Sequence, residues 1–127
     1  MNPLKIRKAK LEDLNTLLEF EQGIITAERP YDPTLKQGTI SYYNIEKMLL
    51  ANDIEVLVAE VDTVIIGSGY ARVATAKPYL NHDSYAYLGF MFTDPKYRGK
   101  GVNSKIIEAL KNWCSSLGIY ELRLDVY

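Results

Sequence analysis

Residues 98–103 of this chain, Arg-Gly-Lys-Gly-Val-Asn, have the composition of an anion-binding loop. Gly99 and Gly101 allow the backbone to turn sharply and to bring consecutive N–H groups close to a ligand. Arg98 and Lys100 add positive charge beside those amides. Because phosphate groups bind to such amides and cations, the spacing predicts a site for a phosphorylated ligand.

The elements around this loop are a predicted strand and a predicted helix. Residues 85–93 form a nearly continuous apolar run, typical of a strand in the centre of a sheet, and Asp94-Pro95 ends it. From Asn103 onward apolar residues recur at helical spacing, and the start of such a helix carries partial positive charge. Gly118 is placed to end this helix. Strand, glycine loop and helix in this order favour a phosphate site over a plain surface turn.

Two other glycine motifs do not fit the chain. In a dinucleotide-binding fold the glycines follow the strand directly, whereas here residues 94–98 intervene and Ser104 occupies the third glycine position. A P-loop needs Gly-Lys-Ser/Thr at a fixed distance after its first glycine, and none follows Gly99.

Composition indicates one globular domain spanning residues 1–127. Hydrophobic residues make up 47% of the chain, enough for a core, and 15 basic against 16 acidic residues give no general attraction to nucleic acid or membranes. No signal peptide or membrane-spanning apolar run is present, and the single cysteine, Cys114, excludes an internal disulfide. We therefore expect a cytoplasmic protein without nucleic-acid or membrane partners, and the sequence shows no metal site.

The remaining patterns predict a mixed α/β sheet. Strands are expected at residues 4–9, 54–61, 64–73 and 121–127, and helices at residues 11–22 and 41–51. The order is strand, helix, helix, strand, strand, strand, helix, strand. Short turns make the middle strands antiparallel, whereas the last strand–helix–strand unit should be a right-handed crossover between parallel strands.

Three glycines and one segment carry further expectations. Gly23 is expected to end the first helix, and residues 27–39, which contain two prolines, to form a loop. Gly67 and Gly69 lie inside a predicted strand, where glycine indicates a bulge or a close backbone approach.

Residues 92–103, Phe-Thr-Asp-Pro-Lys-Tyr-Arg-Gly-Lys-Gly-Val-Asn, resemble the acetyl-CoA motif of the GCN5-related N-acetyltransferases, the GNAT superfamily. In that family a strand and Asp-Pro precede Arg/Gln-x-x-Gly-x-Gly/Ala. Weaker similarity at residues 4–9 and 12–14 extends the resemblance over essentially the whole chain. Asn103 departs from the usual Gly or Ala; it either narrows the pyrophosphate site or caps the helix, and capping is favoured because Asn caps well.

The resemblance implies a GNAT-like acyl-CoA N-acyltransferase fold and an enzyme that transfers acetyl from acetyl-CoA to a primary amine by direct attack in a ternary complex. The acceptor would be a small-molecule or protein amine. By position, backbone amides of Met91, Phe92 and Thr93 would bind the pantetheine arm and the acetyl oxygen, and the pyrophosphate would lie against Arg98, Gly99, Lys100, Gly101, Val102, Asn103 and Ser104. The alternative is a non-catalytic acyl-CoA-binding or regulatory module.

Asp125 and Tyr87 are the candidate catalytic side chains. In some family members an acidic residue at the position that matches Asp125 serves as a base, although alternation with Leu124 places Asp125 equally well on a solvent-facing side of its strand. Tyr85 and Tyr87 are hydroxyl candidates, for which packing is the favoured role. Cys114 is expected to be a buried packing thiol.

The resemblance also implies more chain than is present. Family members continue beyond the strand that here ends at Tyr127, with a helix and about two strands that carry an Asn contacting coenzyme A and often a Tyr that protonates the leaving thiolate. The chain thus looks like a family member truncated after its fifth strand. Because an uncovered strand edge seeks a partner, we expect association, for example a homodimer through the C-terminal strand.

Overall fold

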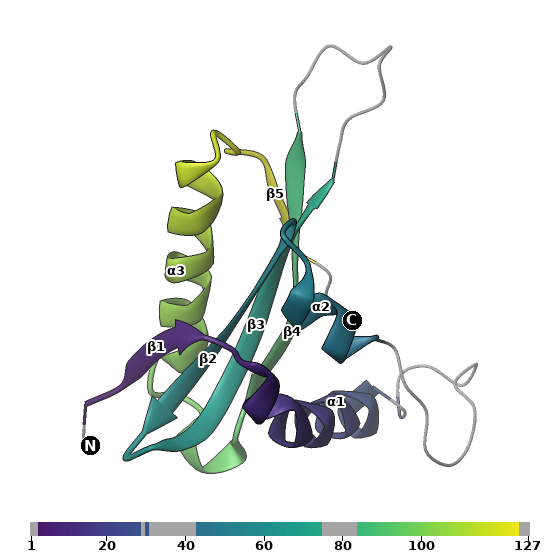
Figure 1. Ribbon diagram of the computed structural model, residues 1–127. Coiled ribbons are helices and arrows are strands. Elements are labelled where there is room, and N and C mark those ends of the chain that lie inside the picture. The colour runs from purple at the N-terminus through teal and green to yellow at the C-terminus, as the bar shows by residue number, and fades with distance from the viewer. Residues whose placement is uncertain (1–2, 29, 31–42, 75–83, 125–127) are drawn as a thin grey trace.

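The computed structural model describes residues 3–28, 30, 43–74 and 84–124. In chain order the elements are β1 (Lys5–Lys8), the 3-10 turn η1 (Leu11–Asp13), α1 (Leu14–Glu28), α2 (Ile45–Leu50), β2 (Ile54–Val61), β3 (Val64–Ala74), β4 (Tyr85–Thr93), the 3-10 turn η3 (Pro95–Tyr97), α3 (Val102–Ser116) and β5 (Leu122–Leu124). This order and the mixed α/β class confirm the prediction from the sequence (Figure 1).

The five strands form one sheet in the order β1-β2-β3-β4-β5. The first four strands pair antiparallel, whereas β4 and β5 pair parallel and are connected through α3, as predicted. The turn between β2 and β3 is the expected two-residue hairpin, and both of its residues, Asp62 and Thr63, have the positive φ that matches the twist of a tight hairpin. Strand β5 lies at one edge of the described sheet, and self-association through it stays a prediction.

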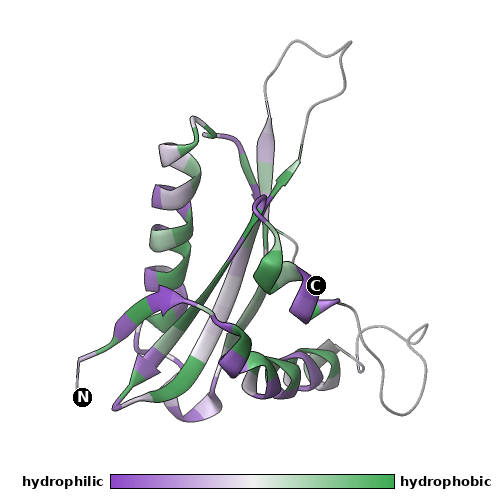
Figure 2. Cartoon of the chain, in the orientation of Figure 1, coloured by the Kyte–Doolittle hydropathy of each residue, from purple (hydrophilic) through white to green (hydrophobic). Residues whose placement is uncertain are grey.

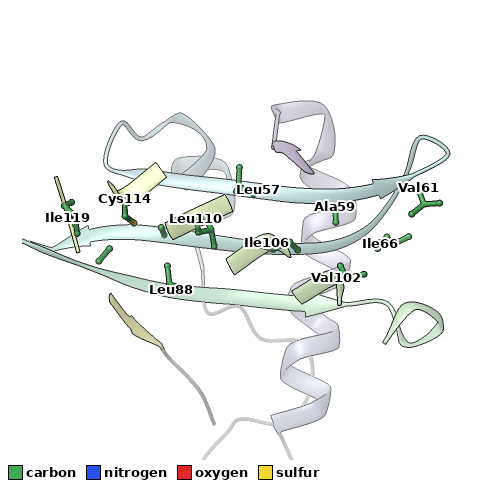
Figure 3. Close-up of a cluster of buried hydrophobic side chains, with 12 residues drawn as sticks. Leu57, Ala59, Val61, Ile66, Leu88, Val102, Ile106, Leu110, Cys114 and Ile119 are labelled. Carbon is green, nitrogen blue, oxygen red and sulfur yellow. The ribbon is translucent and has the colours of Figure 1, made fainter. Parts of the chain in front are cut away.

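Helices cover both faces of the sheet. Figure 1 shows α3 on one side and α1 with α2 on the other, and Figure 2 shows hydrophobic and hydrophilic residues alternating along the helices. The core beneath α3 joins Leu57, Leu88, Ile106 and Leu110 (Figure 3). A second core beneath α1 and α2 contains, among others, Leu17, Phe20, Ile45, Val58, Tyr70 and Phe90. The sheet is therefore the middle layer of three.

Helix α1 does not end at Gly23, so that prediction was wrong. A Cβ atom at Gly23 would be only 2.6 Å from Cε2 of Phe92 on β4. The glycine therefore allows the helix to pack closely against the strand, and the helix continues to Glu28. Residues 27 and 28 of the predicted loop are helical, and residues 29 and 31–39 lie outside the described part of the chain.

The helical spacing of Leu11, Leu14, Leu17 and Leu18 predicts one buried stripe, but two of these leucines are exposed. Leu11 and Leu18 are about half-exposed, whereas Leu17 and Phe20 are buried. The buried face of α1 thus includes Phe20 and excludes Leu18. The reason is that the helix packs on β4 through Gly23 and Phe20. Helical spacing also predicts Leu117 on the buried face of α3, but this residue is half-exposed, since it follows the last helical residue.

Candidate functional site

The glycine loop before α3, residues 98–101, has the backbone conformation that an anion site requires. Gly99 and Gly101 both have left-handed φ angles, 77° and 80°. The first bond of the helix is donated by the Lys105 amide to the Gly101 carbonyl over 3.1 Å. The amides of residues 102–104 precede this bond and so have no acceptor within the helix. They form the positive end of the α3 dipole.

Asn103 is not the cap of this helix, contrary to the sequence expectation. The helix begins one residue earlier, at Val102, and the capping residue is Gly101, without a side-chain bond. Asn103 is therefore the second residue of the helix, and its side chain is exposed. Because Gly101 adopts the left-handed conformation, the chain can enter the helix without a side chain that caps it.

Hydrogen bonds at Asp94 fix the segment between β4 and the glycine loop to the sheet. The Asp94 amide donates to the Ile66 carbonyl of β3 over 2.8 Å, and the Asp94 carboxylate accepts from the Lys96 amide over 2.9 Å. The Arg98 guanidinium returns to the end of β4, where Nε lies 3.4 Å from the Thr93 carbonyl oxygen. The loop thus begins at a defined position at the carboxyl end of β4.

Three exposed cations surround the start of α3. They are Arg98, Lys100 and Lys105. The Lys100 ammonium lies 5.5 Å from the centre of the Tyr97 ring, within the range of a cation–π contact. None of the three forms an ion pair with an acidic residue among the residues that the structure describes. Their charge is therefore available to an external anion.

Two glycines of β3 bring α3 close to the sheet. A Cβ atom at Gly69 would be 2.7 Å from Cγ2 of Ile106 and 2.7 Å from the sulfur of Met91, and one at Gly67 would be 3.1 Å from Cγ1 of Val102. Gly67 and Gly69 thus mark a close approach, as predicted from the sequence. They place the first two turns of α3 beside the end of β4.

Strand β4 has a bulge opposite Gly69, one of the two features that a glycine inside β3 predicts. Gly69 of β3 faces two residues of β4, Phe90 and Met91, and Phe90 has a left-handed φ of 54°. The fully buried Ser68 hydroxyl donates to the Phe90 carbonyl over 2.9 Å and so stabilises this conformation. The predicted bulge therefore exists, but its unusual residue is a buried phenylalanine on the neighbouring strand.

The predicted pantetheine-binding residues begin within this bulge, at Met91, and continue to the end of β4. Met91 packs on the α3 side, and the Phe92 ring stacks on Phe20 of α1 at 4.5 Å between centroids. Thr93 ends the strand. The described part of β5 pairs only with residues 86–88 of β4, so residues 91–93 lie beyond that pairing. The three residues thus lead from the bulge to the end of β4, before the glycine loop.

Tyr87 lies on β4 between two arginines, four residues before Met91. Its register partners are Arg72 on β3 and Arg123 on β5. The Arg72 guanidinium lies 4.8 Å from the Tyr87 ring centre. A side-chain hydrogen bond between Tyr85 and the neighbouring Tyr87 is the main cause of a raised pKa at Tyr85. Asp125 lies outside the described residues, so its predicted role stays a prediction.

A buried carboxylate that the sequence did not single out as functional lies near the bulge. Glu21 of α1 is 1% exposed, and its Oε2 accepts a hydrogen bond from the Tyr43 amide over 2.8 Å. The Tyr43 ring makes edge contacts with Phe90 and Tyr70. The only sequence signal was that an acidic residue falls on an otherwise apolar helical stripe.

Cys114 is buried in the core beneath α3, as predicted. Burial raises the pKa of its thiol, which keeps the sulfur protonated and unreactive at neutral pH. The described residues include no group of three or more potential metal ligands. None of the helices in those residues is long and apolar enough to cross a membrane.

Comparison with known proteins agrees with this geometry. A family model described as "Acetyltransferase (GNAT) family" matches residues 18–127. No curated protein matches the chain. Similar solved structures include an acetyltransferase from Vibrio fischeri, 23% identical, with a TM-score of 0.82 over 96% of this chain and 95% of that one.

Two other structures show the same fold. A predicted acetyltransferase from Clostridium acetobutylicum, solved with acetyl-CoA, is 20% identical, with a TM-score of 0.74 over 98% of this chain and 81% of that one. Glucosamine-6-phosphate N-acetyltransferase from Arabidopsis thaliana is 22% identical, with a TM-score of 0.73 over 99% of this chain and 84% of that one.

Proposed function

Because the chain belongs to the acetyltransferase (GNAT) family, we propose that it transfers acetyl from acetyl-CoA to a primary amine by direct attack within a ternary complex. The observation that carries this proposal is the start of α3, where two left-handed glycines precede three amides without helical acceptors. The acetyl-CoA in the Clostridium acetobutylicum structure supports the choice of cofactor. The buried free thiol of Cys114 agrees with a reducing, cytoplasmic setting.

In this proposal the pyrophosphate of coenzyme A lies against residues 98–104. Amides at a helix start bind phosphate oxygens with charge-assisted hydrogen bonds, and Lys100 and Lys105 add charge that no described acidic residue neutralises. The pantetheine arm then runs along the backbone of residues 91–93. The bulge at Phe90 marks the end of that path, where the thioester lies.

The reaction needs an amine, a carbonyl and two proton transfers. The neutral amine attacks the thioester carbon, a C–N bond forms, the C–S bond breaks, and coenzyme A leaves as a thiolate that takes up a proton. The amine loses its proton to a base. Asp125 is the proposed base, and Tyr87 is a hydroxyl candidate for the proton transfer at the thiolate. Backbone donors at residues 91–93 would stabilise the oxyanion.

Steady-state kinetics test the proposal directly. Release of free coenzyme A is followed while acetyl-CoA and a primary amine are both varied, and the acetylated amine is identified by mass spectrometry. Direct attack predicts intersecting double-reciprocal lines, whereas a covalent acetyl-enzyme predicts parallel lines. Parallel lines would contradict the mechanism. Tight binding of acetyl-CoA without turnover of any amine would instead support the non-catalytic acyl-CoA-binding module.

A further inference from the structure

We propose that Arg72 and Arg123 bind an anionic group of the acceptor, so that the substrate is a primary amine that also carries a carboxylate or a phosphate. This inference rests on the proposed function, because it assigns the acceptor side of the same site. Arg72, Tyr87 and Arg123 form a cross-strand row, the arginine row.

The three side chains of the arginine row share one face of the sheet. Arg72 of β3 and Arg123 of β5 are both register partners of Tyr87 on β4. Directly paired residues project to the same side of a sheet. Two positions further along β4, a Cβ at Gly89 would meet the Tyr70 ring, which belongs to the core beneath α1 and α2. The arginine row therefore lies on the α1 and α2 face, opposite α3.

Aromatic rings hold both guanidinium groups. The Arg72 Cζ lies 4.8 Å from the centre of the Tyr87 ring, and the Arg123 Cζ lies 4.0 Å from the centre of the Tyr85 ring. The two tyrosine rings pack edge to face at 5.4 Å. A guanidinium stacked on a ring keeps its N–H donors at its edge, where they can form paired bonds to a carboxylate or phosphate. The row is thus preorganised for such an anion.

Within the part of the chain that the structure describes, the charge of this row is only partly neutralised. Arg72 is half-buried and forms no ion pair with an acidic residue among the described parts of the chain. Arg123 pairs with Glu121 over 3.0 Å, but both side chains are nearly half-exposed. Exposed pairs of this kind contribute little, so a substrate anion can replace Glu121. Among the described residues, the row therefore holds two cations against one weakly bound carboxylate.

The arginine row is placed to present an amine to the thioester. Tyr87 precedes Met91 by four residues on the same strand, a distance of roughly 13 Å along an extended chain and less across the bulge. The two arginine Cα atoms flank Tyr87 at roughly 5 Å on each side. An anion bound between the arginines would leave the amine of a short substrate directed along β4 towards the bulge.

Matched pairs of small amines provide the test. β-Alanine is compared with β-alaninamide, and O-phosphoethanolamine with ethanolamine, so that only the charged group differs within a pair. Binding to the protein saturated with coenzyme A is measured by calorimetry, and kcat/KM by release of coenzyme A. We expect the anionic member of at least one pair to exceed its neutral partner by about tenfold or more, since bonds to charged groups have that magnitude. The pair that shows the difference distinguishes carboxylate from phosphate.

Two substitutions with opposite expected effects make the test specific. Arg72→Gln should remove most of the preference for the anionic amine, while Arg72→Lys should retain part of it. Glu121→Gln removes the carboxylate that pairs with Arg123 and should increase the preference. Lys111→Gln, which removes an exposed cation from α3 on the other face, is the control and should change neither ratio.

Equal binding of the charged and neutral members of both pairs would overturn the inference, whatever the rate of turnover. An unchanged preference in both Arg72→Gln and Glu121→Gln would also overturn it. Failure of the proposed function looks different, because the protein would then bind the anionic amine selectively without forming an acetylated product. Acetylation of charged and neutral amines at equal rates would keep the proposed function and remove the arginine row from it.

Discussion

The Ser68 hydroxyl donates a hydrogen bond to the Phe90 carbonyl over 2.9 Å, and this bond links β3 to the bulge of β4. Both side chains are buried, and Phe90 has a left-handed φ, which is costly for a residue with a bulky side chain. The conformation persists because Ser68 and the surrounding aromatic rings stabilise it. The bulge in turn determines the orientation of the backbone and side chains of residues 91–93.

Replacement of Ser68 by Ala should therefore affect both stability and cofactor binding. Loss of a donor to a buried carbonyl costs about 1–3 kcal/mol of unfolding free energy. Acetyl-CoA should bind more weakly because the backbone beyond Phe90 is less well fixed. Ser116→Ala is the matched control, since the Ser116 hydroxyl also bonds a carbonyl, that of Trp113, but on the exposed end of α3. Stability is measured by urea unfolding and acetyl-CoA affinity by calorimetry for both variants. Weaker binding in Ser68→Ala alone would show an effect specific to the bulge, whereas equal losses in both variants would show a general effect of losing a hydroxyl.

Gly69→Ala should destabilise the contact between α3 and the sheet. The new Cβ atom would lie 2.7 Å from both Cγ2 of Ile106 and the Met91 sulfur, and such overpacking costs about 1–3 kcal/mol. A double-mutant cycle with Ile106→Ala tests the cause, because removal of Cγ2 relieves the clash. The double variant should lose less stability than the sum of the two single variants. Simple additivity would show that the clash is not with Ile106.

The network around Arg7 predicts how stability depends on pH. The Asp13 carboxylate accepts two hydrogen bonds from the Arg7 guanidinium, at 2.8 and 3.0 Å, and a third from the Lys10 amide. The bond to Arg7 is the main cause of the lowered pKa of Asp13. A carboxylate with a lowered pKa contributes stability above its unfolded-state pKa, near about 4, and that stability is lost as the pH falls through the folded-state pKa.

Asp13→Asn should therefore cost about 1–3 kcal/mol near neutral pH and progressively less in acid. The measurement is the urea midpoint of parent and variant from about pH 7 down to about pH 3. Glu12→Gln, at an exposed neighbouring position, is the control and should run parallel to the parent. If the difference in urea midpoint between Asp13→Asn and the parent stayed constant over this pH range, the negative charge of Asp13 would not contribute to the stability of the protein.

Cys114 offers a test of direct attack. A mechanism without an acetyl-enzyme needs no nucleophilic side chain, and the buried Cys114 has a raised pKa that disfavours the thiolate. Cys114→Ala should reduce stability by about 1 kcal/mol through the small cavity and leave kcat nearly unchanged. A folded Cys114→Ala protein that binds acetyl-CoA normally but has lost acetyl transfer would contradict this mechanism.

Local patterns predicted the elements of the fold, and long-range contacts account for what they missed. The hairpin at Asp62 and Thr63 and the helix end at Gly118 depend on residues adjacent in sequence, and both were predicted. By contrast, Gly23 lies inside a helix, where Phe92, far along the chain, packs against it. No local pattern can distinguish that contact from a helix end.

For the candidate site, too, the part that depends on neighbouring residues was predicted and the part that depends on other strands was missed. The glycine loop was identified because its glycines, its cations and the following helix are contiguous in the sequence. The left-handed Phe90 was missed because an apolar strand with a bulge has the same sequence pattern as one without, and the cause of the bulge lies at Ser68 and Gly69 on another strand. The arginine row was missed for the same reason. Arg72 and Arg123 are on strands that do not pair with each other, and both become neighbours of Tyr87 only when β3 and β5 pair with β4.

The central claim is that the start of α3 binds the phosphates of acetyl-CoA, and two matched glycine variants test it. Gly101 and Gly118 flank α3, have left-handed φ angles of 80° and 76°, and have no atom within 4 Å of an added Cβ. Valine at either position should cost about 1–3 kcal/mol of stability through the same backbone strain. Only Gly101→Val also turns the loop amides away from the ligand.

Calorimetric titration with acetyl-CoA, on proteins shown to be folded by thermal unfolding, is the direct measurement. We expect Gly118→Val to bind like the parent and Gly101→Val to lose about a hundredfold or more in affinity, because several charge-assisted bonds to phosphate are lost together. Equal affinity of Gly101→Val and the parent, or equal losses in the two variants, would contradict the placement of the cofactor at this loop.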